Sequence, residues 1–212
     1  MPERHSPAAG PDPVAARVDA RRDGGRVPIR ALGADDRAAL LGHLLALDSS
    51  DRYLRFGYVA SDAQIRRYVA GIDFARDEVF GVFNRRLELV AAAHIALAGA
   101  APGEAEFGVS VLAQGRARGI GTQLFERAAV FARNRGLHTL RLQCLSRNAA
   151  MMRIARRAGM LVRHCDGESE ATLQIPPHSL LSHLGEWLND AAAEVDFAIK
   201  LGLHRDLPPQ AR

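Results

Sequence analysis

A glycine-rich turn between an apolar strand and a strongly amphipathic helix is the feature that most constrains the fold of this chain. Residues 105–112 (AEFGVSVL) predict a β-strand, residues 114–121 (QGRARGIG) contain three glycines, and apolar side chains then recur at helical spacing up to Gly136. Such a turn directs successive backbone N–H groups into one concavity, and the following helix adds positive potential. We therefore expect an anion-binding loop, in which Gly119 and Gly121 lack the Cβ atoms that would keep the backbone away from the anion.

Two common phosphate-binding motifs do not fit this loop. A P-loop requires a lysine and then a serine or threonine after its second glycine, and no lysine follows Gly121. A dinucleotide fingerprint requires a glycine or alanine at position 124, which is leucine, and an acidic residue after the next strand, where the sequence has Ser-Arg-Asn. A loop that only turns the chain is the remaining alternative.

The rest of the periodicity predicts an α/β (α+β) fold. The polar residues Ser49 to Asp51 are interpreted as a break, and Ser61 as a helix N-cap. This order predicts a mixed, mostly antiparallel sheet with helices on both faces. Strands are expected over 27–32, 77–84, 87–98, 105–112, 138–145, 159–165 and 171–175, and helices over 33–48, 61–72, 119–136 and 148–159.

The two ends of the chain differ from this pattern. Residues 1–25 lack apolar periodicity and are predicted to be a disordered leader. Residues 176–212 are expected to form an extra amphipathic C-terminal helix and a tail, with Val195 and Ala198 on the apolar stripe. We expect this helix to cover the core of its own chain, and a homodimer-forming helix is the alternative.

Composition narrows the function classes. The chain has 212 residues and a formal net charge of +4, and its excess basic residues are dispersed arginines, which argues against nucleic acid as a partner. No apolar run long enough to span a membrane and no signal sequence are present, so a cytoplasmic location without a membrane partner is expected. Two cysteines without ligand spacing give no reason to expect a metal.

Three segments carry a resemblance to a known family. Residues 116–121 (RARGIG) match Arg/Gln-x-x-Gly-x-Gly/Ala and resemble the acetyl-CoA pyrophosphate motif of the GNAT superfamily of N-acetyltransferases. Residues 148–160 (NAAMMRIARRAGM) resemble the second motif of that family. Residues 47–69 are similar to the corresponding stretch in GNAT domains of bacterial protein lysine acetyltransferases. The resemblance spans about residues 26–175 and implies a GNAT acetyltransferase domain there.

The resemblance also implies how acetyl-CoA, the expected co-substrate, is held. Backbone amides of the loop would bind the pyrophosphate, and the strand before it would pair with the pantetheine arm at a bulge where it diverges from residues 138–145. Asn148 would orient the pantetheine, although an N-cap of the following helix explains it equally well. The implied cofactor-binding residues are Val111, Leu112, Arg116, Ala117, Arg118, Gly119, Ile120, Gly121, Thr122 and Asn148.

Transfer to an amine requires a base, because an alkylammonium group is mostly protonated at neutral pH. Glu106 is the first candidate, on the strand face opposite Phe107, and His94 is the second, because it points away from the apolar face formed by Leu89, Ala91, Ala93 and Ile95. Both have ordinary alternatives, a solvated charge and a hydrogen-bonded core histidine. Many family members have a tyrosine as general acid seven residues after the motif asparagine, and this chain has Ala155 there.

The expected function is transfer of an acetyl group from acetyl-CoA to a primary amine, either a protein lysine or N-terminus or a small amine. A catalytically silent acetyl-CoA-binding regulatory module is the alternative, because the usual acid is absent. The acceptor is expected beside the first helices, where Arg52, Tyr53, Arg55 and Phe56 would shape its entrance and favour a carboxylated acceptor.

Overall fold

The computed structural model describes residues 27–97, 101–165, 168–175 and 192–201. They contain a seven-stranded sheet in the order β1-β2-β3-β4-β5-β7-β6. The pair β4–β5 is parallel, and all other neighbouring strands of this sheet pair antiparallel. The strands are β1 (Arg30–Ala31), β2 (Glu78–Phe83), β3 (Leu89–Ala96), β4 (Glu104–Val111), β5 (Thr139–Leu145), β6 (Leu161–Cys165) and β7 (Glu168–Gln174).

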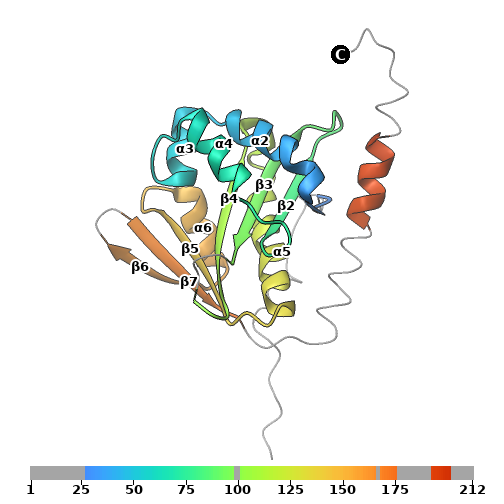
Figure 1. Ribbon diagram of the computed structural model, residues 1–212. Helices are drawn as coiled ribbons and strands as arrows, with labels where there is room; N and C mark the ends of the chain where they lie inside the picture. Colours follow the sequence, from blue (N-terminus) through green and yellow to red (C-terminus); the bar gives the residue numbers. More distant parts are fainter. Residues whose placement is uncertain (1–26, 98–100, 166–167, 176–191, 202–212) are drawn as a thin grey trace, which may run out of the picture.

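Helices cover both faces of the sheet (Figure 1). On one face, Leu124 and Phe131 of α5 and Met152 of α6 pack against Phe107 of β4. On the other face, α2 and α4 bury residues such as Leu44 over β2 and β3. The helices are α2 (Arg37–Leu45), α3 (Ser49–Phe56), α4 (Asp62–Ala70), α5 (Ile120–Asn134) and α6 (Ala149–Arg157), with short 3₁₀ turns at Ala34–Asp36 (η1) and Ala113–Gly115 (η2). The predicted fold class is confirmed.

The parallel pair β4–β5 separates after a short contact. Only Glu104 to Glu106 of β4 pair with β5, although β4 continues to Val111. Over the same stretch the β3–β4 ladder runs without a register shift, so the bulge expected in β4 is not there. The opening arises because β5 turns away to pair along its whole length with β7. The second half of β4 therefore presents an unpaired edge toward β5.

Sequence analysis missed α3, because its polar sequence SSDRYLRF buries no residue completely and was interpreted as a break. Local signals for it do exist. The side chain of Asp48 accepts a hydrogen bond from the amide of Asp51 as an N-cap, and Gly57 ends the helix with a φ of 80°. This helix packs over β4 and β5, where the two strands separate.

The apolar face of β3 differs at one position from the prediction. The β2–β3 register shifts between Val82 and Phe83, so that Phe83 is opposite Leu89 while Val82 is opposite Ala91. Leu89 consequently packs in the same cluster as Ala92, beneath α2, and leaves the cluster that contains Ala91 and Ile95. His94 does lie on the face opposite Ile95, as predicted.

The described part of the C-terminal region is a helix over residues 192–201, which lies beside the β1–β2 edge (Figure 1). Phe197 packs edge-to-face on Phe83 at 5.0 Å, and Lys200 Nζ donates to the Phe83 carbonyl at 2.9 Å. The predicted apolar face of this helix is wrong at Val195, which is 59% exposed, and Ala193 is buried instead. The predicted leader (1–25) and the rest of the C-terminal segment lie outside the described residues.

Candidate active site

The loop between β4 and α5 presents free backbone donors. The first backbone bond of α5 runs from the Gln123 amide to the Gly119 carbonyl at 3.1 Å, and the amides of residues 117–122 have no acceptor in the described part of the chain. Ala117 and Gly119 have φ angles of 60° and 71°, which turn this stretch, here named the amide loop (residues 117–122), around a concavity. The amide loop is thus suited to a phosphate-sized anion.

The open edge of β4 carries a second group of free donors. The Leu112 amide donates to Val90 of β3 at 2.9 Å, and its carbonyl accepts from Gly115, so both backbone groups of Leu112 are used within the fold. Because successive backbone groups of a strand point to opposite sides, Val109 and Val111 direct their amides away from β3, toward the opening. The pairing expected from Leu112 is therefore available at Val109 and Val111.

Arg116 is engaged by the protein itself. Its guanidinium forms an ion pair with Asp51 of α3, and its Nε donates to the carbonyl of Val111 at 3.2 Å. Arg118 is exposed and has no side-chain partner within the described residues. Of the two arginines expected to face an anion, Arg118 is free and Arg116 connects the loop to α3.

Each of the two loop glycines also has a structural reason within the protein itself. A Cβ at Gly119 would meet nothing within 4 Å, so this glycine is required for its positive φ. A Cβ at Gly121 would lie 3.3 Å from Ile154 Cδ1 of α6, so Gly121 allows close packing of two helices. Ile120 is buried in the core, whereas its amide and that of Thr122 belong to the free donors.

Asn148 is a helix cap in this structure. It is buried, and its Oδ1 accepts a hydrogen bond from the Met151 amide at 3.1 Å. Its backbone amide donates to Leu145, and its side-chain nitrogen Nδ2 donates to no described residue, so the cap leaves the Nδ2 donor free. Ala155, two turns further along α6, is fully buried in the apolar core and provides no proton donor.

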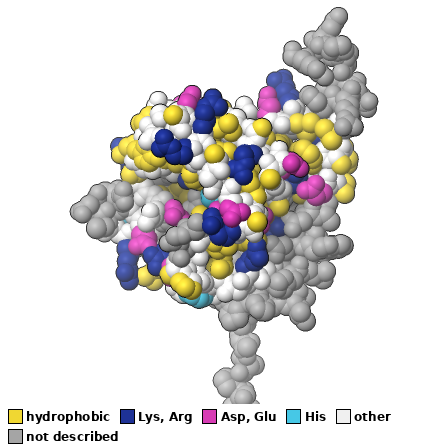
Figure 2. All heavy atoms as spheres, viewed as in Figure 1, with side chains coloured by type: hydrophobic (Ala, Val, Ile, Leu, Met, Phe, Trp, Pro, Cys, Tyr) yellow, Lys and Arg dark blue, Asp and Glu magenta, His cyan; other side chains and the backbone are white. Residues whose placement is uncertain are grey.

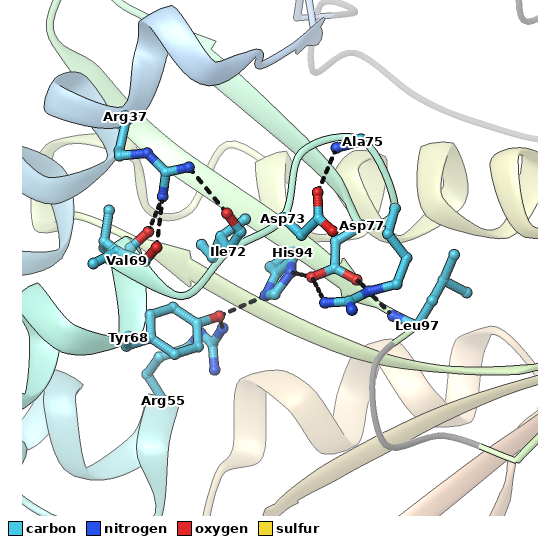
Figure 3. Close-up of polar contacts among 12 residues, drawn as sticks. Arg37, Arg55, Tyr68, Val69, Ile72, Asp73, Ala75, Asp77, His94 and Leu97 are labelled. Atoms are coloured by element: carbon cyan, nitrogen blue, oxygen red, sulfur yellow. Dashed lines mark hydrogen bonds and ion pairs between the residues drawn. The ribbon is translucent and has the colours of Figure 1, made fainter.

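His94 lies in a line of polar side chains on the opposite face of the sheet (Figure 3). Arg55 Nη2 donates to the Tyr68 hydroxyl at 2.8 Å, and that hydroxyl lies 2.7 Å from His94 Nδ1. On the other side, His94 Nε2 lies 3.4 Å from a carboxylate oxygen of Asp77. Because Tyr68 accepts from Arg55, it donates its own proton to Nδ1, which places the ring proton of His94 on Nε2, toward Asp77.

This environment shifts two pKa values. Burial lowers the pKa of His94 below 6.5, and the positive charge of Arg55 adds to the shift, while Asp77 partly opposes it. Burial alone would raise the pKa of Asp77, but hydrogen bonds from Arg76 and from the Leu97 amide lower it. Near neutral pH, His94 is therefore an uncharged imidazole next to a carboxylate, which is the state that accepts a proton.

A pocket of about 410 Å³ opens next to this line. We name it the His94 pocket; it is lined by Tyr58, Gln64, Arg67, Tyr68, Gly71, Ile72, Arg76, Asp77, His94 and Ala96. A second cavity of about 10 Å³ shares Tyr68, Ile72 and His94 with it and reaches Gly108 and Ser110 of β4. The second cavity thus lies between residues of the His94 pocket and β4.

Gly108 and Arg55 determine how the second cavity is filled. A Cβ at Gly108 would lie 2.6 Å from the Arg55 guanidinium carbon, so only glycine allows Arg55 to lie flat on β4. Glu106 is on the same sheet face, opposite Ala96, but it is exposed and does not line the His94 pocket. The structure therefore brings His94, and not Glu106, next to the pocket.

Tyr68, Asp77 and Gly108 were not identified from the sequence. Tyr68 and Asp77 come from α4 and from the residue before β2, and nothing in their local sequences connects them to His94. The lone glycine within the strand was the available signal, because a glycine in a strand often marks the close approach of another group. This signal would not have identified Arg55 as that group.

The other residues expected at the acceptor entrance have structural contacts. Arg52 donates to the carbonyls of Leu45, Leu47 and Ala60 and pairs with Asp62. Tyr53 lies under the Arg147 guanidinium at 4.4 Å, and Phe56 packs edge-to-face on Tyr68. Arg52 therefore fastens α3 to its neighbours and does not face the pocket.

A second buried histidine joins the covering helices to β4. His43 Nδ1 donates to the Leu89 carbonyl at 2.8 Å, and Nε2 lies 2.8 Å from the Ser110 hydroxyl, whose proton it accepts. Burial lowers the pKa of His43 to about 4, against the opposing effect of the Leu89 hydrogen bond. It is a neutral structural contact over most of the physiological pH range.

Other classes of site have little support in the described residues. They contain no group of three or more His, Cys, Asp or Glu side chains arranged for a metal ion. No helix among them is both long and apolar enough to cross a membrane. On the face shown in Figure 2, arginines are interspersed with acidic and hydrophobic side chains and do not form one basic patch.

Comparisons with known proteins agree with this geometry. Residues 26–161, more than half of the chain, match the family model described as the acetyltransferase (GNAT) domain. The fold resembles the GNAT domain of PAT from S. lividans, with a TM-score of 0.60 and 24% identity over 72% of this chain and 93% of that one. No curated protein matches the sequence significantly.

Two other similar structures contain coenzyme A. One is the spermidine N-acetyltransferase from Vibrio cholerae in complex with CoA and spermine (TM-score 0.55, 15% identity, 69% of this chain and 94% of that one). The other is a ribosomal L7/L12 alpha-N-protein acetyltransferase in complex with coenzyme A (TM-score 0.53, 18% identity, 69% and 93%). At these identities the similarity concerns the fold alone.

Proposed function

Because the chain belongs to the GNAT family of acetyltransferases, we propose that it is an acetyl-CoA-dependent N-acetyltransferase that acts on a primary amine, with residues 26–175 as its catalytic domain. The observation that carries this proposal is the pair of unused backbone donor groups, one on the open edge of β4 and one in the amide loop that follows it. These two groups fit a ligand that combines a diphosphate with an extended amide-containing arm.

Different residues would bind the pyrophosphate and the pantetheine arm of acetyl-CoA. Amides of Ala117 to Thr122 would bind the pyrophosphate, with Arg118 adding charge, and Val109 and Val111 would pair with the pantetheine arm as a missing strand would. The free side-chain nitrogen of Asn148, Nδ2, would donate to the same arm. When bound, this co-substrate supplies an acetyl thioester, and an amide of the β4 edge would stabilise the negative charge on its carbonyl oxygen.

The His94 pocket supports the amine half of the reaction. An acceptor ammonium passes a proton to the Tyr68 oxygen while the Tyr68 proton moves to His94 Nδ1, and Asp77 stabilises the resulting imidazolium through Nε2–H. The free amine would then attack the thioester carbonyl carbon, and the carbon–sulfur bond would break. The attacking nitrogen would lose its second proton to water or to the departing thiolate. The sulfur leaves as a thiolate, which a thiol with a pKa of about 8.5 permits without an acid at Ala155.

The fully buried Ala155 favours one second candidate, a module that binds acetyl-CoA without turnover. The two functions are separated by measuring acetyl-CoA-induced thermal stabilisation together with thiol release over a panel of amines. Stabilisation with thiol release supports the transferase, and stabilisation without release from any amine supports the silent module.

A pair of matched variants tests the amide loop. Gly121→Glu places a carboxylate among the free donors and should abolish the stabilisation by acetyl-CoA. Gly42→Glu introduces the same side chain in α2, where a Cβ meets nothing within 4 Å, and should keep it. Full stabilisation of folded Gly121→Glu would exclude the amide loop as the pyrophosphate site.

A further inference from the structure

The charges around the His94 pocket do not balance. Asp77 is the acidic residue in its lining, and Arg76 holds that carboxylate with Nε at 3.1 Å and Nη2 at 3.4 Å. Asp77 also accepts from the Leu97 amide and faces His94, so its negative charge is already satisfied. A further basic side chain in the lining therefore has no anionic partner within the pocket.

That side chain is Arg67. It projects from α4 into the pocket lining, it is exposed, and it forms no side-chain hydrogen bond or ion pair with any described residue. Arg55 lies outside this lining, in the adjoining second cavity, where it donates to Tyr68 and carries a second positive charge. A second cationic group on the acceptor would meet Arg67 at the wall, whereas an anionic group would find Arg67 free.

We propose that the acceptor is an amine that also carries a carboxylate, and that Arg67 is the residue that selects for this carboxylate. This inference rests on the proposed transferase function. The amine enters toward Tyr68 and His94, and the carboxylate stays at the wall beside Arg67. The fold alone does not decide the acceptor, because it is shared with an enzyme whose structure contains spermine, a polycation.

The test uses acceptors that differ only in charge. Matched sets consist of 6-aminohexanoate, its amide and 1,6-diaminohexane, a second set with a shorter spacer, and lysine peptides flanked by glutamate or by glutamine. Thiol release gives kcat/KM for each. We expect the carboxylated member of at least one set to exceed its neutral member by about fivefold or more, and the diamine to be the poorest. A preference among the small amines identifies a small carboxylated molecule as the acceptor. A preference among the peptides identifies a glutamate beside the acceptor lysine as the source of the carboxylate.

Two variants assign the preference to a residue. Arg67→Gln should lower the ratio of kcat/KM for the carboxylated acceptor to kcat/KM for its neutral amide to about one, and it should keep the stabilisation by acetyl-CoA. Arg66→Gln removes a neighbouring exposed arginine that does not line the pocket, and it should keep the preference.

The outcomes separate this inference from the proposed function. If neutral or cationic amines are acetylated as fast as the carboxylated ones, or if folded Arg67→Gln keeps the full preference, the carboxylate inference is wrong and the transferase stands. If acetyl-CoA binds and no amine releases thiol, both are wrong.

Discussion

The amide loop and the His94 pocket lie on either side of β4 and differ in which atoms form them. The amide loop is one continuous segment whose donors are backbone amides, fixed by the φ angles of Ala117 and Gly119. The His94 pocket combines side chains from α4, β3 and the segments that follow α3 and precede β2. A backbone site tolerates most side-chain changes and depends on conformation, whereas a side-chain network depends on the identity of each member.

The largest effect is expected in the side-chain network. His94→Gln keeps a polar group of similar size but removes the proton acceptor, so kcat should fall by about 10²- to 10⁴-fold while acetyl-CoA still stabilises the protein. In the wild type, activity should decline as the pH falls through the lowered pKa of His94, below 6.5, because the protonated ring accepts no proton.

The pH profile of the variant provides the check. His94→Gln should lack this acidic limb and recover part of its rate at alkaline pH, where more of the amine is unprotonated. Glu106→Gln is the matched comparison and should keep the wild-type profile. An unchanged profile in His94→Gln, or its loss in Glu106→Gln, would move the base away from the His94 pocket.

A second effect concerns stability and the neutral ring of His43. Its pKa is about 4 in the folded state and about 6.5 when unfolded, so between these pH values only the unfolded chain binds the proton. The free energy of unfolding should therefore decrease as the pH falls from about 6.5 to about 4, by up to about 3 kcal/mol from this residue. Urea unfolding of wild type and His43→Gln over this range tests it, and equal pH dependence would contradict it.

The backbone site should respond to conformation. Gly119→Ala adds a methyl group in open surroundings, so its cost is the positive φ alone, about 1 kcal/mol in the free energy of unfolding, with weaker acetyl-CoA binding. Gly33→Ala is the control, because its surroundings are equally open and its φ is −101°. Equal stability of the two variants would show that the positive φ is not required.

The smallest expected effect concerns the ion pair that joins α3 to the residue before the amide loop. Asp51→Asn releases Arg116 from its ion pair, and because Arg116 is half exposed the stability should change by less than about 1 kcal/mol. The freed arginine should bind acetyl-CoA about two- to threefold more tightly, as measured by calorimetry. Asp62→Asn is the control, because it breaks the ion pair between Asp62 and Arg52 and should leave acetyl-CoA binding unchanged. Weaker binding in Asp51→Asn would show that the Asp51–Arg116 pair supports the loop.

The sequence predicted the amide loop because its requirements are local. Glycine spacing, the strand before it and the amphipathic helix after it are all contained in one short segment, and the same holds for the Ser61 cap of α4. The details failed where contacts between distant elements decide. The Leu112 backbone is used by β3, and Leu89 changes face because of a register shift with β2.

By itself, the sequence determined the mixed sheet, the helices on both of its faces and the position of the amide loop, which is the proposed anion site, because strand and helix periodicity and glycine conformation act over a few residues. Only the tertiary structure decided the composition of the His94 pocket, which is the proposed acceptor site. It placed Tyr68, His94 and Asp77 in one line and laid Arg55 over Gly108. It also left Arg67 without an anionic partner in the same pocket. Side chains far apart in the chain meet according to how helices pack on the sheet, and no local pattern encodes that meeting.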